Sequence, residues 1–88
     1  MTARKYLPLE PSEVERILKD LGFELKRTRG DHNQWEGVTH GTRRVCTVQQ
    51  IRGSFSIGRM KTMIEQIGLT PDEFYKANSN IAKRYYGH

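Results

Sequence analysis

The sequence has only one cysteine and no long hydrophobic run. A single cysteine excludes an internal disulfide, which fits a reducing compartment. Cys46 lies among β-branched residues, where we expect a small packed side chain rather than a nucleophile, and no histidine lies close enough to it in sequence to indicate a zinc motif. The first residues are polar and basic, which predicts neither a signal peptide nor a membrane span. We therefore expect a cytoplasmic protein that needs no metal or other cofactor.

Acidic residues are scarce in the middle of the chain. The 88 residues carry 15 Lys and Arg against 10 Asp and Glu, for a net charge of +5. Residues 26–61 contain eight bases, and their only acids are Asp31 and Glu36. A basic segment of this kind is typical of proteins with a polyanionic partner. The alternative is a solvated surface with a surplus of Lys and Arg.

Two segments have the apolar spacing of an amphipathic helix. They place apolar residues at i, i+3, i+4 and i+7, and are Val14, Ile17, Leu18, Leu21 and Met60, Met63, Ile64, Ile67. Gly22 and Gly68 follow them, as expected at helix C-termini. The first helix begins either with a capping box of Ser12 and Glu15 or with Pro11 in its first turn.

The end of the chain predicts a third, short helix. Thr70-Pro71-Asp72-Glu73 supplies a cap, a first-turn proline and two acids at the positive end of the helix dipole. Asn78-Ser79-Asn80 and the basic and aromatic residues after it allow two interpretations. Residues 78–88 either extend this helix or form a basic aromatic tail.

Between the two longer helices the hydrophobic period changes to two, which predicts strands. The expected strands cover residues 23–28, 32–36 or 32–38, and 43–49. Residues 37–42, rich in glycine and threonine, form the turn before the third strand. Val45 and Val48 of that strand have opposite parity, so the buried face is undecided. Either a bulge or a segment covered on both faces would reconcile them.

The turn between the first two strands decides which side chains share a face. A three-residue loop at Arg29-Gly30-Asp31 pairs Leu25 with Trp35, so that both face the helices. A two-residue turn at Gly30-Asp31 would instead pair Lys26 with Trp35 and place a charge on the core face, so we expect the three-residue loop. His32 then points away from the helices. The side chains expected on its face, from the pairs Lys26–Gln34 and Thr28–His32, are Lys26, Thr28 and Gln34.

These elements predict an α+β fold. The expected order is helix, three antiparallel strands, helix and a short C-terminal helix, with the two main helices on one face of a three-stranded sheet. The length indicates one domain over residues 1–88. Within it we expect an arm at 1–9, a core at about 12–75 and a tail at 78–88.

Four stretches carry a resemblance to a known family. They are Leu18-Lys19-Asp20-Leu21-Gly22-Phe23, Arg29-Gly30-Asp31-His32 with the aromatic Trp35, Arg43-Arg44-Val45, and Gly58-Arg59-Met60 leading to Ile67-Gly68-Leu69. In this order and at these distances they resemble the HicA (YcfA-like) toxins of type II toxin–antitoxin systems. The resemblance implies an α-β-β-β-α fold like a double-stranded-RNA-binding domain and ribosome-independent cleavage of mRNA. It also implies a HicB-like antitoxin that covers the site.

The same resemblance assigns catalysis to His32, which follows the Gly30-Asp31 pair. Histidine can give or accept a proton near neutral pH because its ordinary pKa is ~6.5. The expected cleavage needs no metal, since the neighbouring 2′-hydroxyl of the RNA attacks the phosphate while Lys or Arg stabilises the developing charge. With one placed histidine, the second proton must come from water, a lysine or the substrate. On the residues alone, a surface histidine without a role is the simpler interpretation.

Eight basic residues are the candidates for RNA contacts. They are Lys26, Arg27, Arg29, Arg43, Arg44, Arg52, Arg59 and Lys61. The family often has a lysine pair before the glycine of the second helix, where this chain has Ser56-Ile57, so Arg52, Arg59 and Lys61 would supply the charge there. Arg43-Arg44 either contacts phosphates or forms a solvated strand edge.

Two other functions fit the same basic face. One is a non-catalytic RNA- or DNA-binding module, and the other is a small interaction protein whose basic patch meets an acidic partner. In each case Asp31 forms the turn, and Trp35 packs in the core rather than stacking on a base. Our leading hypothesis is a toxin that is monomeric when free and acts as a metal-independent endoribonuclease on single-stranded mRNA.

Overall fold

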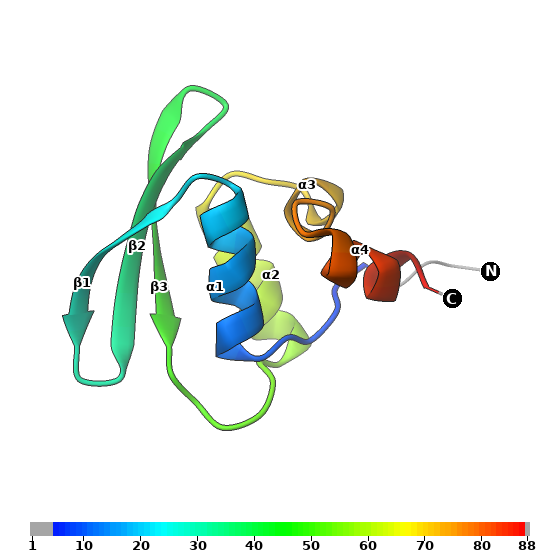
Figure 1. The fold of residues 1–88 in the computed structure, drawn as a ribbon, viewed down its shortest axis with the longest axis horizontal. Helices are drawn as coiled ribbons and strands as arrows, with labels where there is room; N and C mark the ends of the chain where they lie inside the picture. Colours follow the sequence, from blue (N-terminus) through cyan, green and yellow to red (C-terminus); the bar gives the residue numbers. More distant parts are fainter. Residues whose placement is uncertain (1–4, 88) are drawn as a thin grey trace.

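The computed structural model describes residues 5–87; residues 1–4 of the predicted arm and His88 lie outside the described residues. The elements are α1 (Pro11–Asp20), β1 (Glu24–Arg29), β2 (His32–Thr39), β3 (Thr42–Gln49), α2 (Ile57–Gln66), α3 (Pro71–Tyr75) and α4 (Ser79–Tyr86). Figure 1 shows the antiparallel sheet β1-β2-β3 as one layer, α1 and α2 on one of its faces, and α3 and α4 further from the sheet. The predicted α+β class and the order α-β-β-β-α are confirmed.

The start of α1 differs from the predicted capping box. The helix begins at Pro11, and the Glu13 carboxylate accepts a hydrogen bond from the backbone N–H of Glu10 at 2.9 Å. The box of Ser12 and Glu15 is therefore wrong, and the alternative with Pro11 in the first turn is confirmed. Glu15 is turned toward the sheet, where its carboxylate accepts hydrogen bonds from two side chains of β2.

The apolar faces of α1 and α2 form the centre of the core. Their buried residues agree with the predicted spacing, and are Val14, Ile17, Leu18, Met60, Met63, Ile64 and Ile67. Gly22 and Gly68 follow the helices with φ of 92° and 70°, a region that glycine adopts without strain. Trp35, Cys46 and Val48 cover these faces from the sheet.

The turn between β1 and β2 is shorter than predicted. Arg29 pairs with His32, so the turn consists of Gly30-Asp31 alone and the predicted three-residue loop is wrong. Thr28 pairs with Asn33 rather than with His32, and its hydroxyl donates to the Asn33 side chain at 3.0 Å. Thr28 therefore lies on the side of the sheet that faces the helices, which corrects its predicted place beside His32.

A β-bulge at Lys26 compensates for the shorter turn. Leu25 pairs with Trp35, as predicted, and the next pair is Arg27 with Gln34, so Lys26 is the extra residue and its predicted pairing with Gln34 is wrong. The bulge allows a two-residue turn without setting a charge opposite the tryptophan. Trp35 is buried against the helices, and Leu25 lies on the same face as predicted, although it is 46% exposed because it belongs to the edge strand.

β2 runs further than predicted. It ends at Thr39, which pairs with Thr42 across the two-residue turn His40-Gly41. Both turn residues have positive φ, 50° and 76°, as in a type I′ hairpin. The broad glycine- and threonine-rich turn expected from the sequence is therefore wrong. Gly37 is part of β2. A Cβ at this position would lie 2.5 Å from the ring of Phe23, so only glycine leaves room for the ring.

β3 is a regular strand with one buried face. Cys46 and Val48 are buried toward the helices, whereas Val45 is 41% exposed on the other face. The pairing of β2 with β3 has no shift, so neither the bulge nor the doubly covered segment expected for the two valines is present. Burial raises the pKa of the Cys46 thiol to about 12, which suits a packed residue and not a nucleophile.

The arm and the C-terminal helices pack on each other. The Tyr75 hydroxyl accepts a hydrogen bond from the N–H of Leu7 at 2.8 Å and donates to its carbonyl at 2.7 Å. Tyr85 stacks on Tyr75 with ring centroids 4.2 Å apart, and its hydroxyl donates to the carbonyl of Lys5. Residues 79–86 form the separate helix α4, so the interpretation in which residues 78–88 extend the third helix is wrong.

Tyr75→Phe is expected to lower the free energy of unfolding by about 1–3 kcal/mol, because it leaves both backbone groups of Leu7 unpaired. Tyr86→Phe is the control, since that hydroxyl donates to Asp72 at the surface, and we expect a change below ~0.5 kcal/mol. Urea unfolding followed by circular dichroism measures both variants. Equal unfolding midpoints for the two variants would show that the hydrogen bonds of Tyr75 to Leu7 do not stabilise the fold.

Candidate functional site

His32 lies at the start of β2, the middle strand, with its side chain 48% exposed. It pairs with Arg29 on β1 and with Gln49 on β3. Directly paired residues of an antiparallel sheet share a face, and this face is opposite Trp35 and away from α1 and α2, as predicted. We call it the open face. The pairings place on it Glu24, Arg27, Arg29, His32, Gln34, Glu36, Val38, Arg43, Val45, Thr47 and Gln49.

Asp31 forms the turn before His32, as expected, and also contacts the histidine. Its Oδ1 lies 2.7 Å from Nδ1 of His32. Its backbone carbonyl accepts a hydrogen bond from the N–H of Gln50 at 2.6 Å, which ties the turn to the residue after β3. The carboxylate contact was missed from sequence because a turn residue can direct its side chain to either side.

Glu15 supports the same end of the sheet from the helix side. One of its carboxylate oxygens accepts hydrogen bonds from Asn33 Nδ2 at 2.7 Å, Trp35 Nε1 at 2.8 Å and Gln50 Nε2 at 3.3 Å. Asn33 is the neighbour of His32 in β2, and Gln50 holds the turn at Asp31. α1 therefore fixes both the strand and the loop that hold His32.

Two of the predicted RNA-contacting cations, Lys26 and Arg43, are neutralised by carboxylates, and Arg43 pairs with Val38 far along β2 from His32. Nζ of Lys26 lies 2.8 Å from Glu24 Oε1, and Nη2 of Arg43 lies 2.7 Å from Glu36 Oε1. The hydrogen bond from Arg43 lowers the pKa of the Glu36 carboxyl, and that from Lys26 lowers the pKa of Glu24. The sequence predicted Lys26 on the same face as His32. Its charge is instead neutralised by the Glu24 carboxylate.

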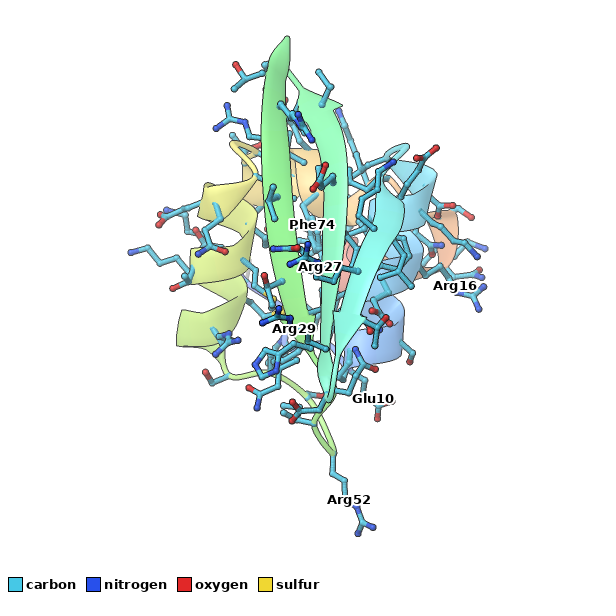
Figure 2. All side chains as sticks on the ribbon, turned by 90° about the vertical axis from the view of Figure 1, so that its left-hand side faces the viewer. Glu10, Arg16, Arg27, Arg29, Arg52 and Phe74 are labelled. Atoms are coloured by element: carbon cyan, nitrogen blue, oxygen red, sulfur yellow. The ribbon has the colours of Figure 1, made fainter. Side chains whose placement is uncertain are left out.

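Arg27 and Arg29 remain uncompensated by any carboxylate at ion-pair distance within residues 5–87. Arg29 is the direct partner of His32, and Arg27 is the partner of Gln34, one step further along the face. Figure 2 shows both arginines over the sheet on the side turned away from the helices. They are the cations closest to His32 by strand pairing.

Arg44 lies on the other face of the sheet. It pairs with Gly37, and its Nε donates to Thr39 Oγ1 at 3.2 Å. The Thr39 hydroxyl donates in turn to the carbonyl of Ile67, and the guanidinium of Arg44 lies against Gly68. Arg44 thus ties β2 and β3 to the end of α2, and Arg43 alone of this pair lies on the open face.

The elements that build this face are also those matched by a family model. The model, described as the HicA toxin of bacterial toxin–antitoxin, matches residues 11–69, from α1 through α2. The chain belongs to the HicA toxin family. No curated protein and no solved structure gives a match. The resemblance found in the sequence is confirmed, and this HicA toxin is one component of a toxin–antitoxin pair, which implies an antitoxin as its partner.

The second helix of the HicA toxin begins where the family often has its lysine pair. Ser56 caps α2, with Oγ accepting a hydrogen bond from the N–H of Arg59 at 3.2 Å. Arg59 and Lys61 are exposed on α2, and the Arg59 guanidinium lies 5.9 Å from the ring centroid of Phe55. Arg52 projects from the loop before α2, beyond the end of the sheet (Figure 2).

Three further observations bear on the site of the HicA toxin. His40 lies in the turn at the opposite end of β2 from His32, and its Nε2 is 2.8 Å from Glu73 Oε2. Residues 5–87 contain no cluster of three or more His, Cys, Asp or Glu side chains arranged to hold a metal ion. No helix in that part of the chain is long and apolar enough to cross a membrane.

Proposed function

We propose that this HicA toxin is a metal-independent mRNA endoribonuclease with His32 as its catalytic residue. The observation that carries the proposal is the pairing of a half-exposed His32 with Arg29, a cation without a carboxylate partner in the described chain. A proton-transfer group beside a free cation supplies what cleavage by a neighbouring hydroxyl requires. Membership of a toxin family supports a harmful activity.

In the proposed reaction, Nε2 of His32 accepts the proton of the 2′-hydroxyl. The 2′-oxygen bonds to phosphorus and the bond to the 5′-oxygen breaks, which leaves a 2′,3′-cyclic phosphate and a free 5′-hydroxyl. Arg29 and Arg27 donate hydrogen bonds to the other phosphate oxygens and stabilise their charge. The leaving oxygen takes its proton from water, because His40 is held by Glu73 at the far end of β2.

Asp31 positions His32 for this step. Its carboxylate at Nδ1 keeps the ring proton on that nitrogen, so the unprotonated Nε2 is presented to the substrate. The carbonyl of Asp31, held by Gln50, fixes the turn that directs the carboxylate.

Asp31→Asn is expected to slow cleavage by about fivefold, because an exposed hydrogen bond to a charged group contributes on the order of 1 kcal/mol. Asparagine suits the turn, so the fold should be kept. The ¹⁵N shifts of the His32 ring should show a loss of the Nδ1–H tautomer, and Asp31→Glu should restore part of the rate. An unchanged tautomer ratio in Asp31→Asn would refute the positioning role.

We further propose that a HicB-like antitoxin covers the open face. Val38 and Val45 are 62% and 41% exposed there, and a partner that buries them and extends along the face to the start of β2 would also block His32. The toxin released from this partner is monomeric and acts on single-stranded mRNA in the cytoplasm. An antitoxin added to the toxin should stop cleavage and protect the backbone amides of β2 and β3 from hydrogen exchange. Inhibition without that protection would place the antitoxin elsewhere.

The proposed activity is tested by incubating single-stranded RNA with the purified toxin in EDTA and identifying the product ends. Cleavage that leaves 2′,3′-cyclic phosphates supports it. Cleavage that EDTA prevents would contradict the metal-independent reaction. RNA that binds with a steep salt dependence but stays intact would instead indicate the non-catalytic binding module.

A further inference from the structure

A hollow of about 490 Å³ lies between β3 and α2. Its lining is formed by Val45, Thr47, Arg59, Thr62, Met63 and Gln66, and we call it the β3–α2 groove. The volume lies within the roughly 300–1,000 Å³ that is typical of ligand sites. Val45 and Thr47 belong to the open face, so the groove opens onto the same surface as His32.

The groove runs along the sheet away from His32. β3 ends at Gln49, the partner of His32, and the following loop enters α2 at this same end of the sheet (Figure 1). Arg59, in the first turn of α2, is therefore at the end of the groove near His32, and Gln66 is at the far end. Thr47 is two residues from Gln49 along β3, a step of roughly 7 Å.

Arg59 provides a cation at the near end of the groove. No carboxylate lies within ion-pair distance of it in the described part of the chain. Its guanidinium is held beside the buried ring of Phe55. Beyond it, Val45 and Met63 are apolar, and the remaining lining residues can donate and accept hydrogen bonds, namely Thr47, Thr62 and Gln66.

We propose that the β3–α2 groove binds a nucleotide of single-stranded RNA next to the scissile phosphate, an inference that rests on the proposed function. Arg59 binds the phosphate of this nucleotide, the base lies against Val45 and Met63, and the Gln66 amide reads the base edge. A backbone cation, an apolar surface and an amide are the groups with which proteins hold unpaired bases. A duplex keeps its bases stacked inside the helix and cannot place one in the groove.

A second hollow, of about 410 Å³, lies on the helix side of the sheet and does not fit RNA as well. Its lining consists of Ser12, Glu15, Arg16, Lys19, Asp20 and Trp35. The Glu15 carboxylate in its lining is already hydrogen-bonded to three side chains and would repel a phosphate. The sheet also separates this hollow from His32, which lies on the open face.

The test uses the full toxin carrying His32→Ala, so that RNA stays intact, and a fluorescein-labelled single-stranded RNA of mixed sequence. Adding Arg59→Ala should weaken binding by about tenfold, the effect of losing one hydrogen bond to a charged group. The slope of log affinity against log salt should become shallower by ~0.7, the value for one phosphate contact of a single strand. Fluorescence anisotropy over a range of KCl concentrations measures both quantities.

Arg16→Ala is the matched control, because it removes the same charge from α1, outside the open face (Figure 2). It should leave the affinity and the salt slope unchanged. Gln66→Ala should keep the salt slope but reduce the difference in affinity between poly(U), poly(A) and poly(C). Equal losses of affinity in Arg59→Ala and Arg16→Ala, or no loss in Arg59→Ala, would contradict the binding of RNA in the β3–α2 groove. The groove would then be a candidate site for a protein partner.

Failure of the groove and failure of the proposed function give different results. If the wild-type toxin cleaves RNA and Arg59→Ala binds it normally, the groove assignment is wrong and the nuclease stands. If the toxin does not cleave RNA but Arg59→Ala lowers affinity and salt slope as stated, the nuclease is wrong. The groove then stands as the RNA site of a binding module.

Discussion

His32→Ala is expected to slow RNA cleavage by roughly 10²–10⁴-fold, because the variant lacks the group that accepts the 2′-hydroxyl proton. The loss should fall on kcat and not on KM, since Arg27 and Arg29 remain on the open face to bind the phosphate. The half-exposed position of His32 means that the variant should unfold at the wild-type urea concentration. Cleavage of a labelled RNA at several RNA concentrations, together with growth after expression in cells, measures these effects.

His40→Asn is the matched control for this experiment. His40 has a φ of 50° in its turn, a conformation that asparagine tolerates well, and its surface contact with Glu73 contributes little stability. This variant should cleave RNA and arrest growth as the wild type does. Should His32→Ala match the wild type in both assays, the catalytic assignment fails.

Gly37→Ala is expected to lower the free energy of unfolding by about 1–3 kcal/mol or more, as overpacking of a core does. The new Cβ would lie 2.5, 2.6 and 2.8 Å from three ring atoms of Phe23. The ring cannot withdraw easily, because Phe23 is buried and its N–H is bonded to the carbonyl of Leu18 at 2.9 Å. The φ of Gly37 is not positive, so the effect arises from lack of space and not from backbone strain.

Gly58→Ala separates this close approach from a general effect of replacing glycine. Nothing lies within 4 Å of a Cβ at Gly58, and it is in the first turn of α2, where alanine is the better helix former by up to ~1 kcal/mol. We expect this variant to be as stable as the wild type or slightly more so. Urea unfolding of both variants decides the matter, and equal destabilisation would show that the Phe23 contact is not the cause.

The helices could be predicted because their signals are local. The apolar spacing in α1 and α2 and the glycines that follow them are visible within about two turns of sequence. The start of α1 was harder, because two overlapping capping patterns were present. Tertiary contacts decided between them, since Glu15 bonds to Asn33 and Trp35 in the sheet and Glu13 bonds to the start of the helix.

The register of the sheet could not be predicted because it depends on one inserted residue. The alternation of apolar and charged side chains gave the correct pairing of Leu25 with Trp35. It could not show the bulge at Lys26, since a longer turn explains the same alternation. The error did not affect the prediction that His32 and Trp35 lie on opposite faces, because they belong to one regular strand three positions apart.

The sequence predicted which residues form the candidate site better than it predicted the contacts between their side chains. Sequence reasoning placed His32 on a basic face, but it could not tell neutralised from free cations. That distinction depends on side-chain contacts such as Arg43 with Glu36. Neither could it tell that Arg44, next in sequence to Arg43, lies on the opposite face against the end of α2.

The bulge at Lys26 also affects how copies of this chain meet in solution. β1 is an edge strand whose residues are all exposed, and an open edge of this kind can recruit another strand and begin aggregation. The extra residue interrupts the row of backbone donors and acceptors, and Arg27 and Arg29 repel the same strand of a second molecule. The irregularity that sets the hairpin register thus protects the edge from self-assembly at high concentration, while the open face beside it remains free.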